Sequence, residues 1–440
     1  MARTEPAPVS FQVRPGGRLH GRLRVPGDKS ISHRSIMLGS LAGDRTQISG
    51  FLEGEDSLAT LAAFRAMGVC IEGPTGGRVS IESVGLHGLQ APSTPLDLGN
   101  SGTSMRLLTG LLAGQRFDST LIGDRSLSRR PMGRVIEPLT AMGAVIESRE
   151  GGTAPLNILG GQALRGIDYA TPVASAQVKS SILLAGLYAE GQTCVTEPSP
   201  TRDHTERMLA AMGYAVNGSG HRICLAGGGR LDGVQIEVPA DISSAAFFLV
   251  GASIAAGSDL LLTHVGINPT RTGVLEILRS MGADIELQHV REVGGEPVAD
   301  IRVRQAQLKG IEIPPHLVPL AIDEFPVLFV AAASAAGRTV LTAAEELRVK
   351  ESDRIQVMAD GLQALGVDAR PTADGMIIEG GRVRGGTVDS HGDHRIAMAF
   401  AMAALVADAP VTVHDCANVS TSFPGFVPLA RDAGVEIVAT

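Results

Sequence analysis

Apolar and polar positions repeat six times along this chain in one order: an apolar helical stripe, a Met-Gly or equivalent turn, and a short β-prone run. A glycine just past an apolar helix can adopt the left-handed conformation that ends the helix, so each turn predicts a helix C-terminus followed by a strand. The pattern predicts six copies of one α/β unit. The six turn glycines are Gly68, Gly143, Gly213, Gly282, Gly366 and Gly434.

A second helix in each unit is apolar or small on nearly all of its sides. A helix without a polar face is buried all round. We therefore expect three such helices in the middle of each of two domains, with the sheets outside them. The expected buried helices cover residues 35–41, 105–113, 180–189, 245–256, 327–336 and 396–407.

A polar, turn-like sequence precedes each of these buried helices. The N-terminus of a helix offers free backbone N–H groups and a partial positive charge, which suit an anion. Ordinary N-caps rich in Ser, Asp and Asn are the alternative, but six such sites in register, several with basic residues, favour anion binding. If the helices of a domain are parallel, their N-termini converge on one face, and two such faces form a cleft. The segments are 27–34, 99–104, 174–179, 240–244, 322–326 and 392–395.

Composition narrows the class of protein. The chain has 440 residues, 44% of them hydrophobic and 19% charged, which predicts two or three globular domains. A net charge of −8 argues against a general nucleic-acid binder. The first residues form no apolar secretory segment, and the apolar runs stay well short of the ~20 residues that span a bilayer, so we expect a cytoplasmic protein with no membrane partner.

The four cysteines are scattered and have no C-x-x-C spacing. We therefore expect structural thiols, with neither a disulfide nor a zinc site. They are Cys70, Cys194, Cys224 and Cys416.

Several basic residues stand where an anion would explain them. Lys29 and Arg34 lie around a helix start, where the helix dipole disfavours cations. Gly102 allows close approach of a ligand to the backbone, although a Ser/Gly-rich loop is more often only a turn. Arg129 and Arg130 before a proline could clamp a phosphate or carboxylate, or form a solvated charged turn.

The segment 348–354 carries the most chemical information. The apolar residues that follow it, spaced three and four apart, place Glu351 at the centre of an inward helix face and Arg354 about 60° from it. Two charges on that side should face a cleft; an internal ion pair is the alternative.

Asp323 and His394-Arg395 open two further buried helices, and with Lys29 and Glu351 they supply acid and base candidates among several cations. No Ser-His-Asp arrangement, metal cluster or Walker loop is present in the sequence. The residues alone indicate an enzyme that binds two small anionic substrates in an interdomain cleft and uses general acid/base chemistry.

Together these segments resemble the 5-enolpyruvylshikimate 3-phosphate synthase family over residues 25–426. Four motifs in order resemble the signatures of its class II branch. They are Gly27-Asp28-Lys29-Ser30, Ser175-Ala176-Gln177-Val178-Lys179, Arg202-Asp203-His204-Thr205-Glu206 and Asn268-Pro269-Thr270-Arg271.

The resemblance implies a two-domain inside-out α/β barrel, in which each domain has three βαβαββ repeats with buried parallel helices and outer sheets. One domain would comprise residues 1–27 plus 241–440, the other residues 28–240, with the active site in the cleft between them. The implied reaction moves the enolpyruvyl group of phosphoenolpyruvate to the 5-hydroxyl of shikimate 3-phosphate, on the route to chorismate and the aromatic amino acids. It needs no metal and no organic cofactor, and we expect a monomer.

The resemblance also implies roles for individual residues. Asp323, Glu351 and Lys29 would be catalytic. The residues implied to bind shikimate 3-phosphate are Lys29, Ser30, Arg34, Ser175, Ala176, Gln177, Arg202, Asp323 and Lys350. The residues implied to bind phosphoenolpyruvate are Lys29, Gly102, Arg130, Gln177, Arg354 and Arg395.

Two positions depart from the class I pattern of that family. Thr421 stands where class I members place a lysine, and Leu107 stands where they commonly have proline. Glyphosate, the family's inhibitor, mimics phosphoenolpyruvate. Gly102 predicts room for it, whereas Leu107 and the class II signatures predict tolerance.

Two other functions compete. The sister enzyme transfers enolpyruvyl to UDP-N-acetylglucosamine, but it commonly carries a reactive Cys, sometimes Asp, on a mobile loop of its second repeat, and residues 112–135 contain no Cys. A non-catalytic sensor of phosphorylated metabolites would bind without turnover and would leave Lys29 and Glu351 without a role.

Overall fold

The computed structural model describes residues 9–440, so the first eight residues of the N-terminal segment assigned above to one domain lie outside it. The chain forms two compact units. Unit 1 comprises the N-terminal residues up to Pro26 together with Pro239–Arg291 and Pro297–Thr440, and unit 2 comprises Gly27–Val238 and Glu292–Glu296. Each unit encloses its own apolar core.

Unit 2 contains three four-stranded sheets with one shared strand order. In each sheet an edge strand is parallel to its neighbour, and the other pairings are antiparallel. The sheets are β14 (Gln235–Glu237), β3 (Thr46–Ser49), β5 (Arg78–Glu82), β4 (Cys70–Thr75); β6 (Leu96–Asp97), β7 (Ser119–Ile122), β9 (Thr153–Leu159), β8 (Val145–Arg149); and β10 (Asp168–Ala170), β11 (Gln192–Thr196), β13 (Arg222–Ala226), β12 (Val216–Ser219).

Two of the three sheets of unit 1 repeat this arrangement with help from the N-terminal segment, whereas the third has only three strands, paired antiparallel. Strand β1 (Phe11–Val13) lies between the two last strands of the chain, and β2 (His20–Leu23) is parallel to β15. The sheets are β16 (Asp284–Val293), β17 (Glu296–Arg304), β15 (Asp259–Gly266), β2; β18 (Arg338–Leu341), β20 (Met376–Glu379), β19 (Asp368–Pro371); and β21 (Gly386–Asp389), β22 (Val411–His414), β1, β23 (Ile437–Ala439).

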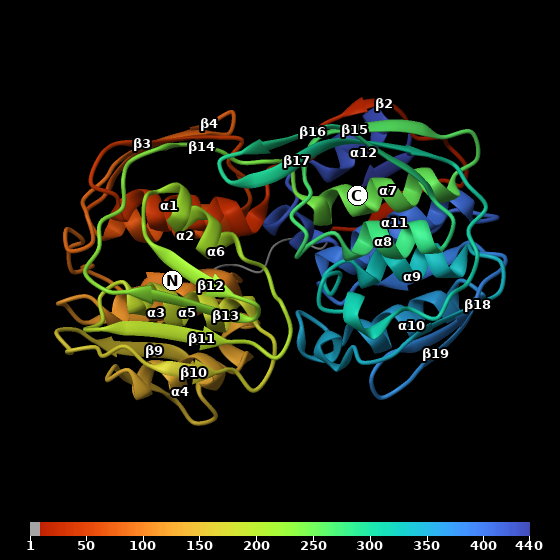
Figure 1. Cartoon of the computed structure of the whole chain (residues 1–440). Coiled ribbons are helices and arrows are strands. Elements are labelled where there is room, and N and C mark those ends of the chain that lie inside the picture. Colours follow the sequence, from red (N-terminus) through yellow and green to blue (C-terminus); the bar gives the residue numbers. More distant parts are fainter. Residues whose placement is uncertain (1–8) are drawn as a thin grey trace. The chain divides into compact units, whose positions relative to one another are not determined.

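The six helices predicted to be buried are present, and nearly all of their residues are buried. In unit 2, strands β9, β11 and β13 lie outside α3 and α5 (Figure 1). Several of these helices begin a few residues earlier than the apolar runs because their capped first turns are polar. They are α1 (Lys29–Leu41), α3 (Gly102–Ala113) and α5 (Ala176–Gly186) in unit 2, and α7 (Ile242–Ile254), α9 (Phe325–Ala333) and α11 (His394–Ala403) in unit 1.

In each of the six repeats, the helix predicted to end at a turn glycine is also present. All six turn glycines have positive φ, between 78° and 111°, so the predicted left-handed helix ends are confirmed. These helices are α2 (Glu55–Ala66), α4 (Gly133–Ala141), α6 (His204–Ala211), α8 (Gly273–Ser280), α10 (Arg354–Ala364) and α12 (Phe426–Ala433). The short 3₁₀ helices are η1 (Leu127–Arg129), η2 (Pro315–Leu317), η3 (Glu345–Val349), η4 (Ala404–Val406) and η5 (Ala417–Thr421).

Helices α3 and α5 pack closely through a glycine. A Cβ added at Gly110 would lie 2.0 Å from the carbonyl oxygen of Ser181, so no larger residue fits there without moving a backbone. This close packing fixes the neighbouring N-termini of the two helices, where the candidate ligands of unit 2 lie.

The prediction of four separate thiols is wrong for two of the cysteines. Strands β11 and β13 pair in a register that sets Cys194 directly opposite Cys224, and the two form a disulfide with Cα atoms 4.1 Å apart. The spacing along the sequence gave no sign of this because the pairing depends on the strand register. Cys70 and Cys416 carry free thiols.

Between residues 9 and 440, no helix is both long enough and apolar enough to span a membrane.

Candidate functional site

In unit 2 the N-termini of the three buried helices are tied together by side chains. Ser104 of α3 hydrogen-bonds through Thr60 of α2 to the Nδ1 atom of His33 in α1, with distances of 2.6 Å and 2.8 Å. Gln177 of α5 donates to the hydroxyl of Thr103 at 3.0 Å. The predicted convergence of these helix starts on one face is therefore confirmed for unit 2.

Polar side chains cap each of these starts. Asp28 accepts from the backbone N–H of Ile31 at 2.9 Å, and Ser101 accepts from Ser104 at 3.1 Å. Ser175 accepts from Val178 at 3.4 Å. Backbone donors and helix dipoles at three adjacent helix starts favour an anionic ligand.

Two predicted ligands on α1 have defined environments. Lys29 forms an ion pair with the nearly buried Asp56. Arg34 is buried, donates to Thr205 at 2.7 Å and to Ser180 at 2.8 Å, and thereby joins α1, α5 and α6. Burial lowers the pKa of Arg34 to about 10, which still leaves the guanidinium charged at neutral pH.

Gly102 is surrounded by guanidinium groups. A Cβ added there would lie 2.8 Å from Nη1 of Arg106 and 3.2 Å from Nη1 of Arg130. Arg130 donates to Asn100 at 2.6 Å, and Arg106 donates to Gln177 at 2.9 Å. The backbone of Gly102 thus lies beside two cations and a helix N-terminus, an arrangement suited to a small dianion.

A buried charge cluster lies behind the helix starts of α5 and α6. The ammonium of Lys179 is 2.7 Å from Glu197 and 2.8 Å from Glu206, and all three side chains are at least 90% buried. Burial opposes the charge of Lys179, but the two carboxylates outweigh it and raise its pKa above the usual value. This cluster holds α5 against α6 near the N-termini of both helices, where the predicted ligands Ser175, Ala176 and Arg202 lie.

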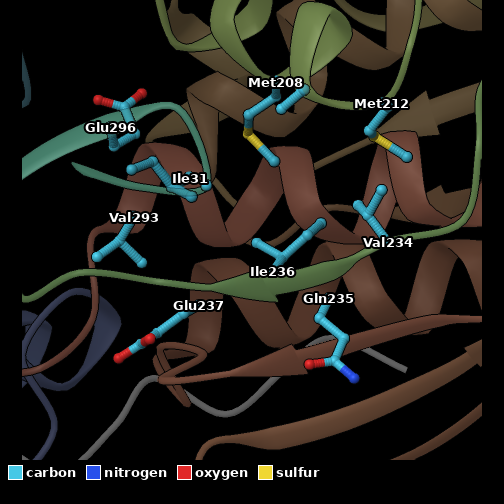
Figure 2. A pocket seen from close by; sticks show the side chains of 11 residues that line it. Ile31, Met208, Met212, Val234, Gln235, Ile236, Glu237, Val293 and Glu296 are labelled. Atoms are coloured by element: carbon cyan, nitrogen blue, oxygen red, sulfur yellow. The ribbon is translucent and has the colours of Figure 1, made fainter.

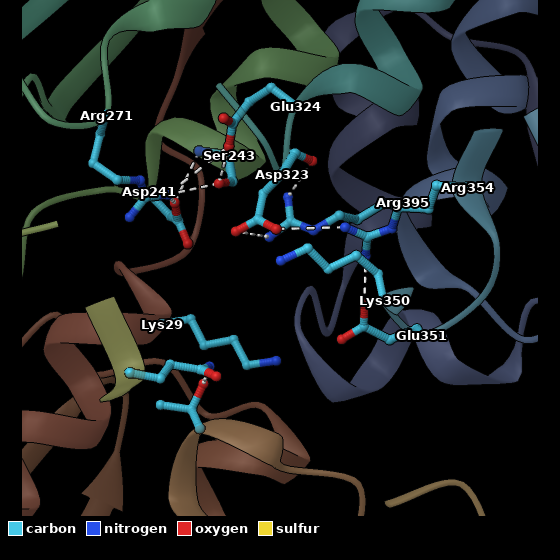
Figure 3. Close-up of polar contacts among 12 residues, drawn as sticks. Lys29, Asp241, Ser243, Arg271, Asp323, Glu324, Lys350, Glu351, Arg354 and Arg395 are labelled. Atoms are coloured by element: carbon cyan, nitrogen blue, oxygen red, sulfur yellow. Dashed lines mark hydrogen bonds and ion pairs between the residues drawn. The ribbon is translucent and has the colours of Figure 1, made fainter. Parts of the chain in front are cut away.

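In unit 1 the buried side chain of Arg354 connects three carboxylates. Its distances are 2.8 Å to Asp393, 2.7 Å to Glu351 and 3.4 Å to Asp323. Dashed lines in Figure 3 mark the contacts with Glu351 and Asp323. Burial alone would raise the pKa of Asp393, but Arg354 outweighs it and holds the pKa below the usual value. Asp393 also caps α11 by accepting from the N–H of Arg395 at 2.9 Å.

The remaining predicted residues of unit 1 lie in the same cluster or next to it. Arg395 donates to the backbone oxygen of Asp323 at 3.1 Å, and its guanidinium is 3.9 Å from the Asp323 carboxylate. Lys350 is 3.5 Å from Glu346 and neighbours Glu351 in the chain. The starts of α9, α10 and α11 therefore meet around three cations and three carboxylates.

The predicted helical position of Glu351 is wrong. Helix α10 begins at Arg354, and its N-cap Asp353 accepts from the N–H of Gln356 at 3.0 Å, so Glu351 precedes the first turn. The alternative of an ion pair with Arg354 is the observed one, while the Glu351 side chain remains 29% exposed. A partly exposed carboxylate held by a buried cation can still exchange a proton with a ligand.

Three residues of these clusters were given no individual role by the sequence analysis. They are Asp56, the partner of Lys29; Arg106, beside Gly102; and Asp393, beside Arg354. Arg106 left a signal, because it is the one charge in an otherwise apolar helix run. Asp56 and Asp393 contact partners far away in the sequence, so the pattern could not reveal their contacts.

The two clusters differ in charge and in chemistry. The cluster of unit 2 is rich in Lys, Arg and helix N-termini and suits anions, whereas the cluster of unit 1 sets carboxylates against cations and suits proton transfer. Among residues 9–440, no group of three or more His, Cys, Asp or Glu is arranged to hold a metal ion.

Unit 2 also has a cavity of about 200 Å³ that is lined mainly by apolar residues. Figure 2 shows Met208, Met212, Val234 and Ile236 around it, with Val293 from the tip of the β16–β17 hairpin. This lining does not match a phosphorylated ligand, so the cavity is not the candidate substrate site.

His33 makes a test of unit 2 by pH possible. Burial first, and then Lys29 and Arg34, lower the pKa of this imidazole well below 6.5, and its Nε2 atom has no hydrogen-bond partner among the described residues. Because the unfolded chain binds the proton more readily, stability is lost as the pH falls below 6.5, by up to about 1.4 kcal/mol per pH unit.

We expect His33→Asn to flatten this dependence in urea unfolding between pH 7.5 and 5.5. The exposed His316 supplies the control His316→Asn, which should keep the slope of the unchanged protein. Equal slopes for all three proteins would contradict the assignment.

Comparison with known proteins places these clusters in context. Residues 13–429 match the model of the family described as EPSP synthase (3-phosphoshikimate 1-carboxyvinyltransferase). Proteins named 3-phosphoshikimate 1-carboxyvinyltransferase from Methylococcus capsulatus and Alkalilimnicola ehrlichii are 71% and 73% identical to the chain; the matches cover 98% of this chain and 98% and 96% of those proteins. A solved structure of EPSP synthase from Acinetobacter baumannii has a TM-score of 0.90 and 59% identity, covering 98% of this chain and 100% of that one.

Proposed function

Because the chain belongs to the EPSP synthase family, we propose that it transfers the enolpyruvyl group of phosphoenolpyruvate to the 5-hydroxyl of shikimate 3-phosphate and releases phosphate. The observation that carries the proposal is the pairing of chemistries in the two clusters. Converging helix starts with Lys29, Arg34 and Arg130 suit two anions, and Asp323 and Glu351 beside Arg354 suit proton transfer. We also propose the two-domain inside-out barrel, which the strand order shared by five of the six sheets supports, with the substrates between the two units.

The proposed ligand sets follow the sequence analysis. Shikimate 3-phosphate takes the cations and caps of α1, α5 and α6, with Asp323 and Lys350 on its hydroxyl groups. Phosphoenolpyruvate takes the surroundings of Gly102 and the guanidinium groups of unit 1. The proposed ligands are Lys29, Ser30, Arg34, Ser175, Ala176, Gln177, Arg202, Asp323 and Lys350 for the first substrate, and Lys29, Gly102, Arg130, Gln177, Arg354 and Arg395 for the second.

The proposed chemistry is addition followed by elimination. Asp323 takes the proton of the attacking hydroxyl as its oxygen bonds to C2 of phosphoenolpyruvate, while Glu351 and Lys29 deliver a proton to the methylene carbon. Glu351 and Lys29 then take back a proton from the new methyl group as the C–O bond to phosphate breaks, which restores the double bond, and the proton held by Asp323 leaves on the phosphate. The cations offset the charge that develops on the carboxylate and phosphate groups.

The direct test measures phosphate release by the purified protein with phosphoenolpyruvate and no added metal. We expect release with shikimate 3-phosphate and none with UDP-N-acetylglucosamine, an acceptor that the relatives' names do not favour. Release only with the nucleotide sugar would assign the chain to the sister activity, and binding without release would favour the sensor. Glyphosate in the same assay decides between the room at Gly102 and the tolerance predicted from Leu107. The cytoplasmic location and the monomeric state stay predictions.

Gly102→Ala tests the site of phosphoenolpyruvate. The new methyl group would approach Arg106 within 2.8 Å, so the flexible guanidinium groups must shift. We expect the KM for phosphoenolpyruvate to rise about tenfold, or ~1.4 kcal/mol, with little change in the KM for shikimate 3-phosphate. Gly133→Ala, where an added Cβ meets nothing within 4 Å, is the control. A rise confined to the KM for shikimate 3-phosphate would contradict the assignment.

A further inference from the structure

One motif has no role in the proposed transfer. Arg271, the last residue of Asn268-Pro269-Thr270-Arg271, lies between β15 and α8 in unit 1 and is only 3% exposed. Hydrogen bonds within the turn of residues 268–271 fix the backbone from which this side chain extends. The side chain of Asn268 accepts from the backbone and hydroxyl of Thr270, and its backbone oxygen accepts from the N–H of Arg271 at 2.8 Å. A cation buried by a built turn needs a partner.

The partners of Arg271 lie at the start of α7. Its Nη2 atom donates to Asp241 at 3.1 Å and to the hydroxyl of Ser243 at 2.6 Å. The Ser243 hydroxyl in turn donates to Glu324, whose carboxylate is 4.0 Å from the same Nη2 atom. Figure 3 shows this group, which we call the Arg271 cluster: Arg271, Asp241, Ser243 and Glu324.

The Arg271 cluster borders the proposed base through a single peptide bond. Glu324 is 2% exposed and follows Asp323 directly. On one side of this dipeptide the Arg271 cluster holds the Glu324 side chain; on the other, Arg354 and Arg395 hold the Asp323 side chain and backbone. The direction of the Asp323 carboxylate therefore depends on contacts from both sides.

Charge balance shows what the loss of Arg271 would do. The cluster has two buried carboxylates, on Asp241 and Glu324, and one guanidinium. Loss of the guanidinium removes the cation that Asp241 and Glu324 both contact, which favours uptake of a proton or a turn of one carboxylate toward water. Either change releases the Glu324 side chain and allows the neighbouring Asp323 to move. A displacement of about 1 Å at a reacting group can lower a rate about 100-fold.

We propose that Arg271 is a positioning residue that fixes the orientation of the base Asp323 through Ser243 and Glu324. The proposal rests on the proposed function. It separates Arg271 from the substrate ligands, because its contacts are with protein side chains. It predicts a loss of turnover that exceeds the loss of shikimate 3-phosphate affinity, since Asp323 is one of nine proposed ligands of that substrate.

The experiment compares Arg271→Met with Arg271→Lys and with Leu278→Ala. The first removes the charge at similar length, the second keeps the charge, and the third opens a cavity at a fully buried residue of α8 in the same unit. For each protein, kcat, both KM values, the Kd for shikimate 3-phosphate by calorimetry and the thermal midpoint are measured.

We expect Arg271→Met to lower kcat about 10- to 100-fold with the Kd for shikimate 3-phosphate changed less than about threefold, and Arg271→Lys to recover part of kcat. Leu278→Ala should lower the thermal midpoint and leave kcat unchanged. In Arg271→Met/Glu324→Gln, kcat should exceed that of Arg271→Met, because the buried negative charge next to the removed guanidinium is gone.

An unchanged kcat in folded Arg271→Met, or parallel losses of kcat and shikimate 3-phosphate affinity, would overturn the proposal. If Arg271→Met does not fold, Ser243→Ala, which removes only the connecting hydroxyl, must lower kcat several-fold with unchanged KM values, and normal turnover in it would overturn the proposal as well. Failure of the proposed function is distinct, since the unchanged protein would then release no phosphate in the same assay.

Discussion

Glu351→Gln is expected to bind both substrates and to lose most of its turnover, with kcat lower by about 10²- to 10⁴-fold. Glutamine keeps the shape of the side chain and a carbonyl oxygen toward Arg354, 2.7 Å away in the present structure, but it cannot exchange a proton. Glu351 is partly exposed and lies beside a buried guanidinium, so its carboxylate can exchange a proton with a ligand while Arg354 holds it in place. Single-turnover phosphate release, together with calorimetric binding of shikimate 3-phosphate, separates chemistry from affinity.

Glu345→Gln is the matched control for this variant. Glu345 lies on η3, is exposed, and loses the same single charge when substituted. We expect its turnover to equal that of the unchanged protein. Normal turnover in Glu351→Gln would remove this residue from the mechanism, and loss of binding without loss of single-turnover rate would make it a ligand.

Lys179→Met is expected to destabilise unit 2 by about 3–5 kcal/mol. The substitution leaves Glu197 and Glu206 buried, side by side, without the ammonium that lies 2.7 Å and 2.8 Å from them. Thermal and urea unfolding of the whole chain should show an earlier transition. The exposed Lys309 provides the control Lys309→Met, which should change stability by less than about 0.5 kcal/mol.

A compensated variant gives this prediction a second test. Adding Glu197→Gln and Glu206→Gln to Lys179→Met removes the unpaired charges, so much of the lost stability should return. The dependence of stability on pH gives a further test, because its direction follows from the pKa of Lys179. Because the folded state raises the pKa of Lys179, its contribution is complete below pH 10.5 and is lost only as the pH rises through the higher folded value. Equal unfolding of Lys179→Met and the unchanged protein at pH 8 would contradict the assignment.

The sequence predicted the helices well because their signals are continuous along the chain. The all-apolar runs that became α7 and α9 needed no knowledge of their partners, and the turn glycines marked their own left-handed conformation. The prediction that Glu351 lies on a helix face was wrong for a local reason. Asp353 caps α10, so a regular helix could not be extended back to Glu351.

Contacts between distant parts of the chain were beyond the pattern. The ion pair of Lys29 with Asp56 and the disulfide of Cys194 with Cys224 depend on how two elements pack or pair, and a shift of one residue would abolish either. The same limit applied to Arg271. The motif that contains Arg271 was recognised in the sequence, but the contact of Arg271 with Ser243, and through it with Glu324, could not be predicted, because these residues lie at the starts of other helices.

The tip of the β16–β17 hairpin has a practical consequence for anyone who wishes to express the halves separately. Residues Glu292–Glu296 belong to unit 2, where Glu296 accepts a hydrogen bond from the buried His204 at 2.7 Å and Gly295 accepts from Arg207 at 3.0 Å. A gene for residues 27–238 alone would omit them. In that fragment the imidazole of His204 would lack its hydrogen-bond acceptor, and the apolar cavity would lack the part of its wall that Val293 forms. We therefore expect a soluble fragment to need the five tip residues joined to it.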